Sequence, residues 1–162
     1  MTNLPCNVHG RLVIEPMNSI ITKANIMDLI KLQKLEDLCF DEDAWPFLDL
    51  VAVLTFPEVI RLKAVVGNQM IGFIAGDLRN KNKIAWIATL AVDPKFQNQG
   101  IGSALLRECE MKLSTTQVRL CLRPANNPAL KLYSRAGYEV IDLWKGYYND
   151  KGDAIIMEKR IT

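Results

Sequence analysis

The sequence predicts a fold of the mixed α/β (α+β) class, with about three to four helices around one sheet. Changes in hydrophobic period indicate this class: apolar residues recur at helical spacing early in the chain, alternate through its middle, and return to helical spacing after about residue 100. The 162 residues, 49% hydrophobic and 23% charged, have the size and composition of one soluble domain. No repeat or linker divides them, so we expect residues 1–162 to form a single domain.

The first part of the chain is expected to form a short strand and two helices. Residues 11–14 predict the strand. Thr22 is placed to cap the first helix, whose apolar residues recur at helical spacing: Ile26, Leu29, Ile30, Leu35 and Leu38. Asp43 is placed to cap the second helix, with Pro46 in its first turn and Pro57 at its end.

The rest of the chain predicts a sheet with two more helices. Residues 59–66, 70–78 and 83–92 are apolar or alternating runs separated by turn-forming residues, which is typical of an antiparallel meander. A helix is expected from Gly100, followed by the strand QVRLCL, a short helix NPALKLYSRAG that Gly137 ends, and two closing strands.

Composition and spacing argue against several functions. The net charge of +2 shows no basic stripe, so we expect no nucleic-acid partner. No apolar run approaches membrane-spanning length and no leader or lipidation pattern begins the chain, so we expect no membrane association and a cytoplasmic location. Cys6, Cys39, Cys109, Cys121 and the sole histidine, His9, lack the spacing of a zinc site, so we expect no metal.

The stretch DPKFQNQGIGSALL, residues 93–106, is the strongest local signal. Gly100 and Gly102 would let an anionic ligand approach the backbone at the start of a helix. A dinucleotide fingerprint would need a third glycine where Leu105 stands, and a triphosphate loop would need a lysine before Ser103. Both are absent, which leaves either another phosphate-binding loop or a structural loop.

Three segments resemble the GCN5-related N-acetyltransferase (GNAT) superfamily. LAVDPKFQNQGIGSALL is similar to its acetyl-CoA motif, and RPANNPALKLYSRAGYEVI to its second motif. GYYNDKGDAIIMEK resembles the C-terminal signature of the protein N-terminal subgroup, which includes RimI-type ribosomal protein alanine acetyltransferases and archaeal N-terminal acetyltransferases. The resemblance spans residues 60–160, and the first 55 residues match loosely. It implies a twisted, mostly antiparallel sheet of about six to seven strands with splayed parallel central strands and about four helices.

The resemblance implies that acetyl-CoA is the cosubstrate and indicates where it would bind. Backbone groups of Leu90 and Val92 would bind the acetyl-pantetheine end, and Asn126 would contact the cofactor arm. Loop and helix residues would hold the pyrophosphate: Gln97, Gln99, Gly100, Ile101, Gly102 and Ser103.

The implied chemistry needs no covalent enzyme intermediate. A neutral amine attacks the thioester carbonyl, backbone N–H groups stabilise the oxyanion, and an acid protonates the leaving thiolate. Tyr133, near the thioester sulfur and seven residues after Asn126, is the expected acid. Its alternative role is that of an aromatic core residue on a short helix beside Ala129 and Leu130.

The general base departs from the family pattern. Relatives place a glutamate or a histidine where this chain has Cys121. Strand alternation puts Cys121 on the same face as Arg119 and Arg123, so it can face the cleft. A thiol with a pKa of about 8.5 is a poor substitute for a carboxylate. Cys121 is therefore either a weak catalyst or a small packed residue, and packing is favoured.

A weak base favours an acceptor that is already partly neutral. At pH 7 roughly a tenth of an α-amine is neutral, whereas a lysine amine is almost wholly charged. The resemblance to the protein N-terminal subgroup implies a protein or peptide N-terminus as acceptor; the missing glutamate counts against this interpretation, although an enzyme with a weak base manages an α-amine more easily than a lysine. Two alternatives stay open: an acetyltransferase for a small amine such as a polyamine or an antibiotic, and an acetyl-CoA-binding domain without turnover.

Five aromatic residues are expected to contact the acceptor. Family resemblance places Tyr147 and Tyr148, together with the loop CFDEDAWP, around the peptide N-terminus. Trp86 is interpreted as packing or as a cleft wall, because an indole nitrogen cannot act as a base. Phe40 and Trp45 either line the cleft or belong to the core. The acids of the loop either attract a cationic acceptor or form a solvated helix start, which is favoured.

Overall fold

The computed structural model describes residues 19–78 and 84–161, and the strand predicted at residues 11–14 lies outside them. The elements in chain order are β1 (Ile20–Lys23), η1 (Ile26–Asp28), α1 (Leu29–Phe40), η2 (Asp41–Asp43), α2 (Phe47–Thr55), β2 (Val59–Val66), β3 (Gln69–Asp77), β4 (Ile84–Val92), η3 (Pro94–Phe96), α3 (Ile101–Leu113), β5 (Gln117–Leu122), α4 (Asn127–Arg135), β6 (Glu139–Trp144) and β7 (Ala154–Arg160). The four α-helices in this part of the chain and its sheet confirm the predicted mixed α/β class.

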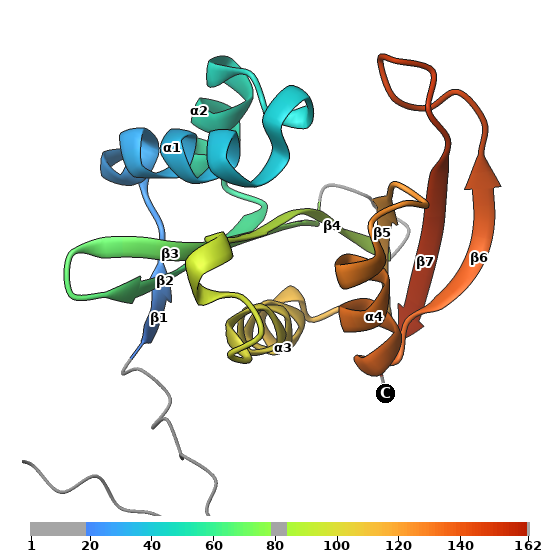
Figure 1. Cartoon of the computed structure of the whole chain (residues 1–162). Coiled ribbons are helices and arrows are strands. Elements are labelled where there is room, and N and C mark those ends of the chain that lie inside the picture. Colours follow the sequence, from blue (N-terminus) through green and yellow to red (C-terminus); the bar gives the residue numbers. More distant parts are fainter. Residues whose placement is uncertain (1–18, 79–83, 162) are drawn as a thin grey trace, which may run out of the picture.

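The sheet has the strand order β1-β2-β3-β4-β5-β7-β6 across the described residues. Helices α1 and α2 cover one face, and α3 and α4 lie on the other (Figure 1). The predicted meander of β2, β3 and β4 is confirmed, and neighbouring strands within it are antiparallel. The sheet is therefore mostly antiparallel, and the parallel pair β4 and β5 lies at its centre.

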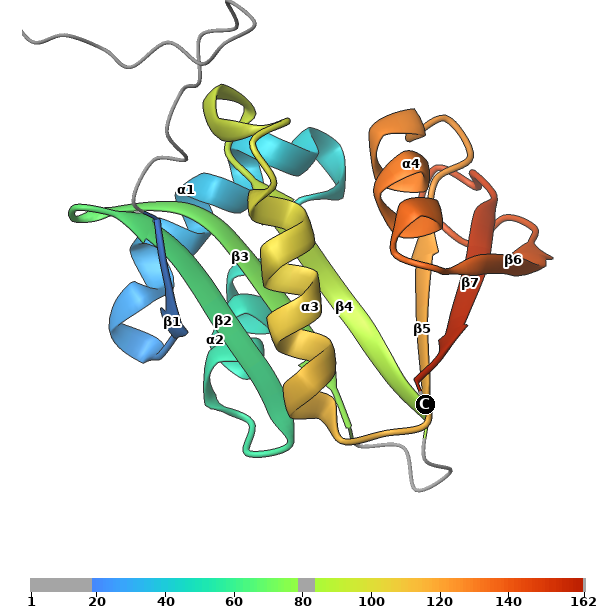
Figure 2. The ribbon, with the colours of Figure 1, turned by 90° about the horizontal axis from the view of Figure 1, so that it is seen from below.

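The parallel pair separates after a short contact. Ile84 to Trp86 of β4 pair with Gln117 to Arg119 of β5, and no later register joins the two described strands. Beyond this point they diverge as a V (Figure 2). The predicted splay of the central strands is confirmed, and it leaves a gap between β4 and β5.

The start of the first helix differs from its prediction. Thr22 does not cap it, because residues 20–23 form β1, which pairs with β2 at the sheet edge. Asn25 is the cap: its side chain accepts from the Met27 N–H at 2.9 Å, while the Asp28 carboxylate accepts from the Asn25 N–H at 3.0 Å. This reciprocal capping box begins η1, which leads into α1.

The start of the second helix also differs. Pro46 occupies the N-cap position of α2, one residue before the first turn, and the helix ends at Thr55, two residues before Pro57. Asp43 does not cap this helix. It is the last residue of η2, and its carboxylate forms an ion pair with the guanidinium of Arg123, the residue after β5.

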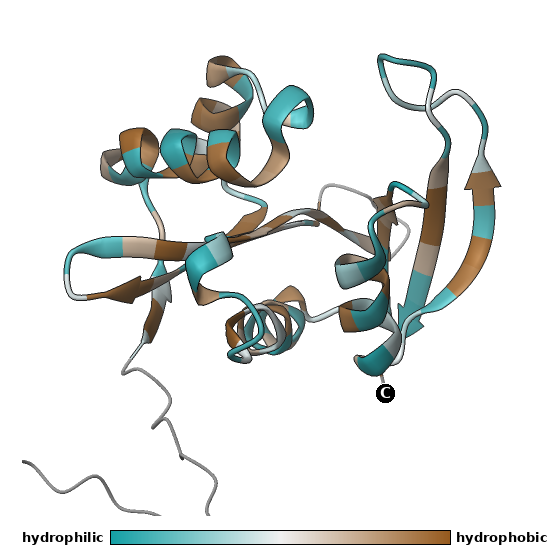
Figure 3. Cartoon of the chain, viewed as in Figure 1, coloured by the Kyte–Doolittle hydropathy of each residue, from teal (hydrophilic) through white to brown (hydrophobic). Residues whose placement is uncertain are grey.

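Both faces of the sheet are packed. Brown, apolar segments lie on the strands and on the helices of both layers in Figure 3. Phe73 lies in the core under α1 and α2, whereas Ile74, its neighbour on β3, lies in the core under α3. Gly72 on β3 lets the first turns of α3 pack closely on the sheet, since a Cβ atom there would lie 2.9 Å from Leu105 Cδ1 and 3.2 Å from Ile101 Cγ2. This packing fixes the start of α3 beside the open end of the V.

Candidate active site

The gap between β4 and β5 exposes backbone groups on its β4 side. The Asp93 N–H donates to the Ile71 carbonyl on β3 at 2.9 Å. Because bonded pairs alternate along an antiparallel ladder, the backbone groups of Leu90 and Val92 point away from β3 and toward the gap. Both are residues expected to bind the acetyl-pantetheine end, and their orientation suits that role.

The glycine loop bends through two left-handed residues into α3. Asn98 has φ of 59° and Gly100 has φ of 83°. A Cβ atom at Gly100 would meet nothing within 4 Å, so the backbone there is open to a ligand. Gly102 has another role, since its Cβ would lie 2.8 Å from Leu132 Cδ1 on α4. Its missing side chain lets α3 and α4 pack together at the mouth of the V.

The polar side chains of this region bind the local backbone. Gln97 Nε2 donates to the Val92 carbonyl at 3.0 Å, and Gln99 Nε2 lies 3.5 Å from the Lys95 carbonyl. Asn126 caps α4, with its Oδ1 accepting from the Ala129 N–H at 3.2 Å. These amides therefore shape the loop and the helix start, and their predicted contacts with the cofactor stay predictions.

Tyr133 lies in the core beneath the V, with 7% of its surface exposed. Its ring meets that of Tyr138 edge to face, with 5.6 Å between centroids. Burial, with smaller contributions from Cys121 and Cys109, raises the pKa of Tyr133 above its ordinary value. The phenol therefore stays protonated at neutral pH, which is the state that a general acid needs.

Cys121 lies on β5 among the tyrosines predicted for the site. Tyr147, Tyr148 and Tyr133 all lie near it: the first two phenols affect the pKa of the Cys121 thiol, and the thiol in turn affects the pKa of Tyr133. Burial raises the pKa of Cys121, so the thiol stays protonated near pH 7. This opposes a role as thiolate base and agrees with the packing interpretation.

The two acceptor-side tyrosines are also protonated. Burial is the largest cause that raises the pKa of Tyr148 to about 12. The pKa of Tyr147 is raised chiefly by its charge interaction with Cys121, with burial as a smaller cause. Neither phenol can therefore act as a base at neutral pH, and the centre offers proton donors rather than acceptors.

A row of rings joins β4 to the loop between β6 and β7. Ring centroids are 5.9 Å apart for Trp86 and Trp144, 5.5 Å for Trp144 and Tyr147, and 5.1 Å for Tyr147 and Tyr148. Trp86 thus packs against Trp144 in this row, and its predicted place in the wall of an acceptor cleft stays a prediction. Trp144 was not anticipated, although its place two residues before the GYYNDKGDAIIMEK segment was a usable signal.

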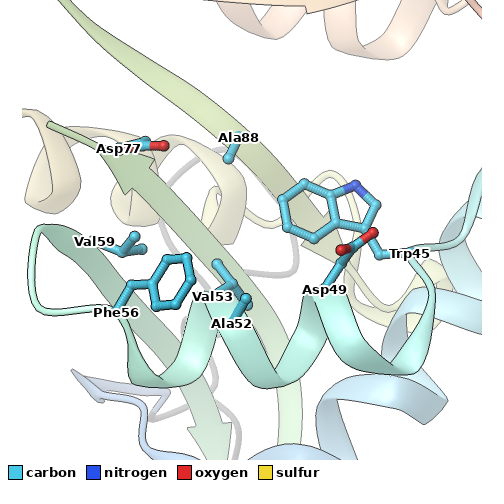
Figure 4. Close-up of a pocket in the computed structure, with 8 residues that line it drawn as sticks. All are labelled: Trp45, Asp49, Ala52, Val53, Phe56, Val59, Asp77 and Ala88. Carbon is cyan, nitrogen blue, oxygen red and sulfur yellow. The ribbon is translucent and has the colours of Figure 1, made fainter. Parts of the chain in front are cut away.

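Phe40 and Trp45 lie on the α1 and α2 side, apart from this row. Both pack, half-buried, against the core under these helices. Trp45 also lines a pocket of about 270 Å³ beside α2, with Asp49, Phe56 and Asp77 among its other residues. Figure 4 shows the Asp49 carboxylate next to the Trp45 ring. The two aromatics therefore serve the core, and any contact with an acceptor stays a prediction.

Two polar groups near the site were missed from the sequence. Glu36 on α1 is fully buried, and its Oε1 accepts from Thr89 Oγ1 on β4 at 3.0 Å. Burial raises the pKa of Glu36, which favours the neutral acid. The second group is the bridge from Arg123 to Asp43 and Asp150. Local patterns gave no signal for either group, because both depend on contacts across the fold.

Neither a metal centre nor a membrane span is found in the part of the chain that the structure describes. It contains no group of three or more His, Cys, Asp or Glu side chains placed to hold a metal ion. None of its helices is both long and apolar enough to cross a bilayer.

Comparison with known proteins identifies the family. Residues 27–138 match the acetyltransferase (GNAT) family. The chain is 30% identical over 143 residues to N-alpha-acetyltransferase RimI of Mycobacterium tuberculosis, across 86% of this chain and 89% of the relative. It is 27% identical over 105 residues to L-amino acid N-acetyltransferase AaaT of Escherichia coli, across 61% of this chain and 65% of that protein.

A solved structure shares the fold. The crystal structure of the ribosomal-protein-S18-alanine N-acetyltransferase from Escherichia coli matches with a TM-score of 0.79 at 24% identity, across 89% of this chain and 94% of that chain. The family match covers more than half of the sequence, including the glycine loop and Tyr133. The chain therefore belongs to the acetyltransferase (GNAT) family and is an N-acetyltransferase.

Proposed function

We propose that the chain transfers the acetyl group of acetyl-CoA to the α-amine of a protein or peptide N-terminus. The gap between β4 and β5 carries this proposal, because the backbone groups of Leu90 and Val92 face it beside the glycine loop. An extended thioester arm can bind such an open strand edge as a further strand would. The N-alpha-acetyltransferase RimI of Mycobacterium tuberculosis supports the acceptor class.

The glycine loop and the start of α3, beside the open end of the gap between β4 and β5, are suited to bind acetyl-CoA. The backbone at Gly100 is open, and the N–H groups at the start of α3 offer donors at the positive end of a helix dipole. Bound acetyl-CoA supplies an acetyl group activated as a thioester. The residues assigned to it are Leu90, Val92, Gln97, Gln99, Gly100, Ile101, Gly102, Ser103, Asn126 and Tyr133.

The chain supplies an acid and an acceptor wall. Tyr133, kept protonated by burial, donates its proton to the leaving sulfur. The row from Trp86 to Tyr148 forms an apolar wall beside Cys121, along which an acceptor can be placed. Backbone N–H groups of β4 in the gap stabilise the negative charge that develops on the carbonyl oxygen.

No strong base is assigned to the acceptor amine. Cys121, Tyr147 and Tyr148 all have raised pKa values, so none of them accepts a proton readily at pH 7. The acceptor therefore reacts from its neutral fraction and releases its proton to water. An N-terminal α-amine meets this requirement, since roughly a tenth of it is neutral at pH 7.

A small amine is the second candidate acceptor. The similarity to L-amino acid N-acetyltransferase AaaT favours it, because the name of that relative gives a free amino acid as the substrate. A site for such a substrate would need to recognise the acceptor's own carboxylate or second amine, whereas a peptide site would not.

Intact-mass detection separates the candidates. Purified protein and acetyl-CoA are mixed with peptides that have free or blocked N-termini, with free amino acids, and with spermidine. Product confined to the free peptides supports the proposal. Product confined to amino acids or spermidine favours the small-amine candidate. Bound acetyl-CoA without any product would indicate a binding domain without turnover.

A further inference from the structure

One guanidinium joins three segments around the acceptor side. Arg123, directly after β5, donates from both Nε and Nη2 to the carboxylate of Asp43, with Nη2 to Oδ1 at 2.7 Å. Its Nη1 lies 3.1 Å from Asp150 Oδ2 in the loop between β6 and β7. Its Cζ also lies 4.0 Å from the centroid of the Tyr148 ring. The residue that directly follows the central strand β5 therefore ties η2 to the loop between β6 and β7.

The two segments that Arg123 joins, η2 and the loop between β6 and β7, are far apart in the sequence. Asp43 is 80 positions from Arg123, and Asp150 is 27 positions from it on the other side. The side chains of Arg123, Asp43 and Asp150 are 30%, 38% and 59% exposed. Exposed ion pairs contribute little to global stability, so the bridge matters more for where it holds the loops. The flat fork of arginine makes such contacts directional.

The bridge reaches the reaction centre through Tyr148. The guanidinium lies over the Tyr148 ring, and Tyr148 in turn lies close enough to Cys121 to affect the pKa of its thiol. Tyr148 also ends the row of rings that starts at Trp86. Fixing Tyr148 therefore fixes one end of the acceptor wall.

We propose that Arg123 is a positioning residue that sets the width of the acceptor entrance, by holding η2 against the loop between β6 and β7. The inference rests on the proposed function, because that function places the acceptor between these segments. The Arg123 guanidinium donates to Asp43 and Asp150, neither of which is among the residues assigned to acetyl-CoA. Loss of the bridge is expected to weaken acceptor binding and to leave acetyl-CoA binding unchanged.

The test compares Arg123→Gln with Arg119→Gln. Arg119 lies on the same strand face, has a similar exposure of 32%, and pairs with Glu158 at 2.7 Å, but it joins no loop of the acceptor side. With an N-terminal peptide, Arg123→Gln should raise the acceptor KM about tenfold while the acetyl-CoA KM stays within about twofold. Arg119→Gln should leave both constants near the wild-type values.

Two further variants separate positioning from charge alone. Arg123→Lys keeps the charge but cannot donate to both carboxylates as a fork, so its acceptor KM should stay raised. Asp43→Asn combined with Arg123→Gln should be no worse than Arg123→Gln alone, because both changes break the same unit. A full recovery in Arg123→Lys, or additive losses in the double variant, would overturn the proposal.

Amide hydrogen exchange tests the bridge without relying on turnover. Exchange at residues 39–46 and 146–152 should be faster in Arg123→Gln than in wild type, and unchanged in Arg119→Gln. If the wild type acetylates no N-terminus, the proposed function fails while the exchange still decides whether the bridge holds the loops. Unchanged exchange, faster exchange with unchanged acceptor KM, or an equal rise in both KM values would each overturn the role of Arg123.

Discussion

At the residue scale, burial determines which protonation states the site can use. The phenol of Tyr133 and the thiol of Cys121 both have raised pKa values, and both therefore keep their protons at pH 7. A centre of this kind can give a proton to a leaving group, but it takes one poorly from an amine. The chemistry then depends on the protonation of the acceptor itself.

Replacing Tyr133 by phenylalanine tests the acid. The change removes the hydroxyl and keeps the ring that packs against Tyr138. We expect kcat to fall by about 10²- to 10³-fold, because the thiolate would leave without its proton, with little change in acetyl-CoA binding. Steady-state kinetics and binding calorimetry measure the two effects. Activity within about threefold of wild type would assign Tyr133 to the core alone.

The pH dependence of the rate tests the missing base. Because Cys121 stays protonated, kcat/KM for a peptide should rise from about pH 6 to 8 with the neutral fraction of the α-amine, and level off above its pKa of about 8. Cys121→Ala should show the same profile, at a rate within about threefold of wild type. A profile that moves with Cys121→Ala, but not with the peptide's own pKa, would show that the thiol takes part.

Glu36 links stability to pH. Its pKa is raised in the folded state, so the folded protein holds this proton more tightly than the unfolded chain does. Its contribution to stability is full below the unfolded pKa of about 4.3 and is lost as pH rises toward the raised value. Glu36→Gln keeps the acceptor for Thr89 and has no proton to lose.

Urea unfolding at several pH values checks this linkage. Between pH 5 and 8 the stability of Glu36→Gln relative to wild type should improve, by on the order of 1 kcal/mol. If the unfolding free energies of the two proteins changed with pH in parallel, the pKa of Glu36 would be the same in the folded and unfolded states.

At the element scale, the junction of α3 and α4 holds the glycine loop in place. Gly102→Ala would place a Cβ atom 2.8 Å from Leu132 Cδ1, so the Leu132 side chain or one of the two helices must shift. We expect a loss of about 1–3 kcal/mol in unfolding free energy and weaker acetyl-CoA binding. Ser103→Ala, at the next and exposed position, is the control for stability. Equal stability of both variants in urea melts would contradict this packing role.

Most elements of the sheet could be predicted from the sequence. The run 59–66 matches β2 at both ends, and β5 and α3 lie where their patterns placed them. The helix starts could not be predicted as well. Thr22 was assigned as a cap because a four-residue edge strand has too little periodicity to be recognised. Asp43 was misjudged because its partner, Arg123, is 80 residues away.

The residues of the candidate site could also be predicted only in part. Motif resemblance marked Tyr133, Cys121 and the two tyrosines after β6, and the fold brings their side chains together. Glu36 and Arg123 were missed because their roles come from burial and from contacts between distant segments. Local sequence patterns carry neither kind of information.

At the scale of the whole molecule, the proposed function places the two substrates on opposite sides of the V. The glycine loop and α3 lie on one side of the V, and η2 with the β6 and β7 hairpin loop borders the other side (Figure 1). The gap between β4 and β5 lies between these two sides. Under the proposed function, the acetyl group is transferred to the amine in this gap, near Tyr133 and Cys121, which lie close enough for Cys121 to affect the pKa of Tyr133.

The central claim is that the chain acetylates the α-amine of a protein or peptide N-terminus, and locating the acetyl group on a peptide tests it most directly. A peptide with a free N-terminus and an internal lysine is incubated with the protein and acetyl-CoA, and tandem mass spectrometry locates the product. Acetyl on the α-amine, with an unmodified lysine, is the predicted result, because only the α-amine has an appreciable neutral fraction at pH 7. Acetyl on the lysine, or an unmodified peptide beside acetylated spermidine, would contradict the claim.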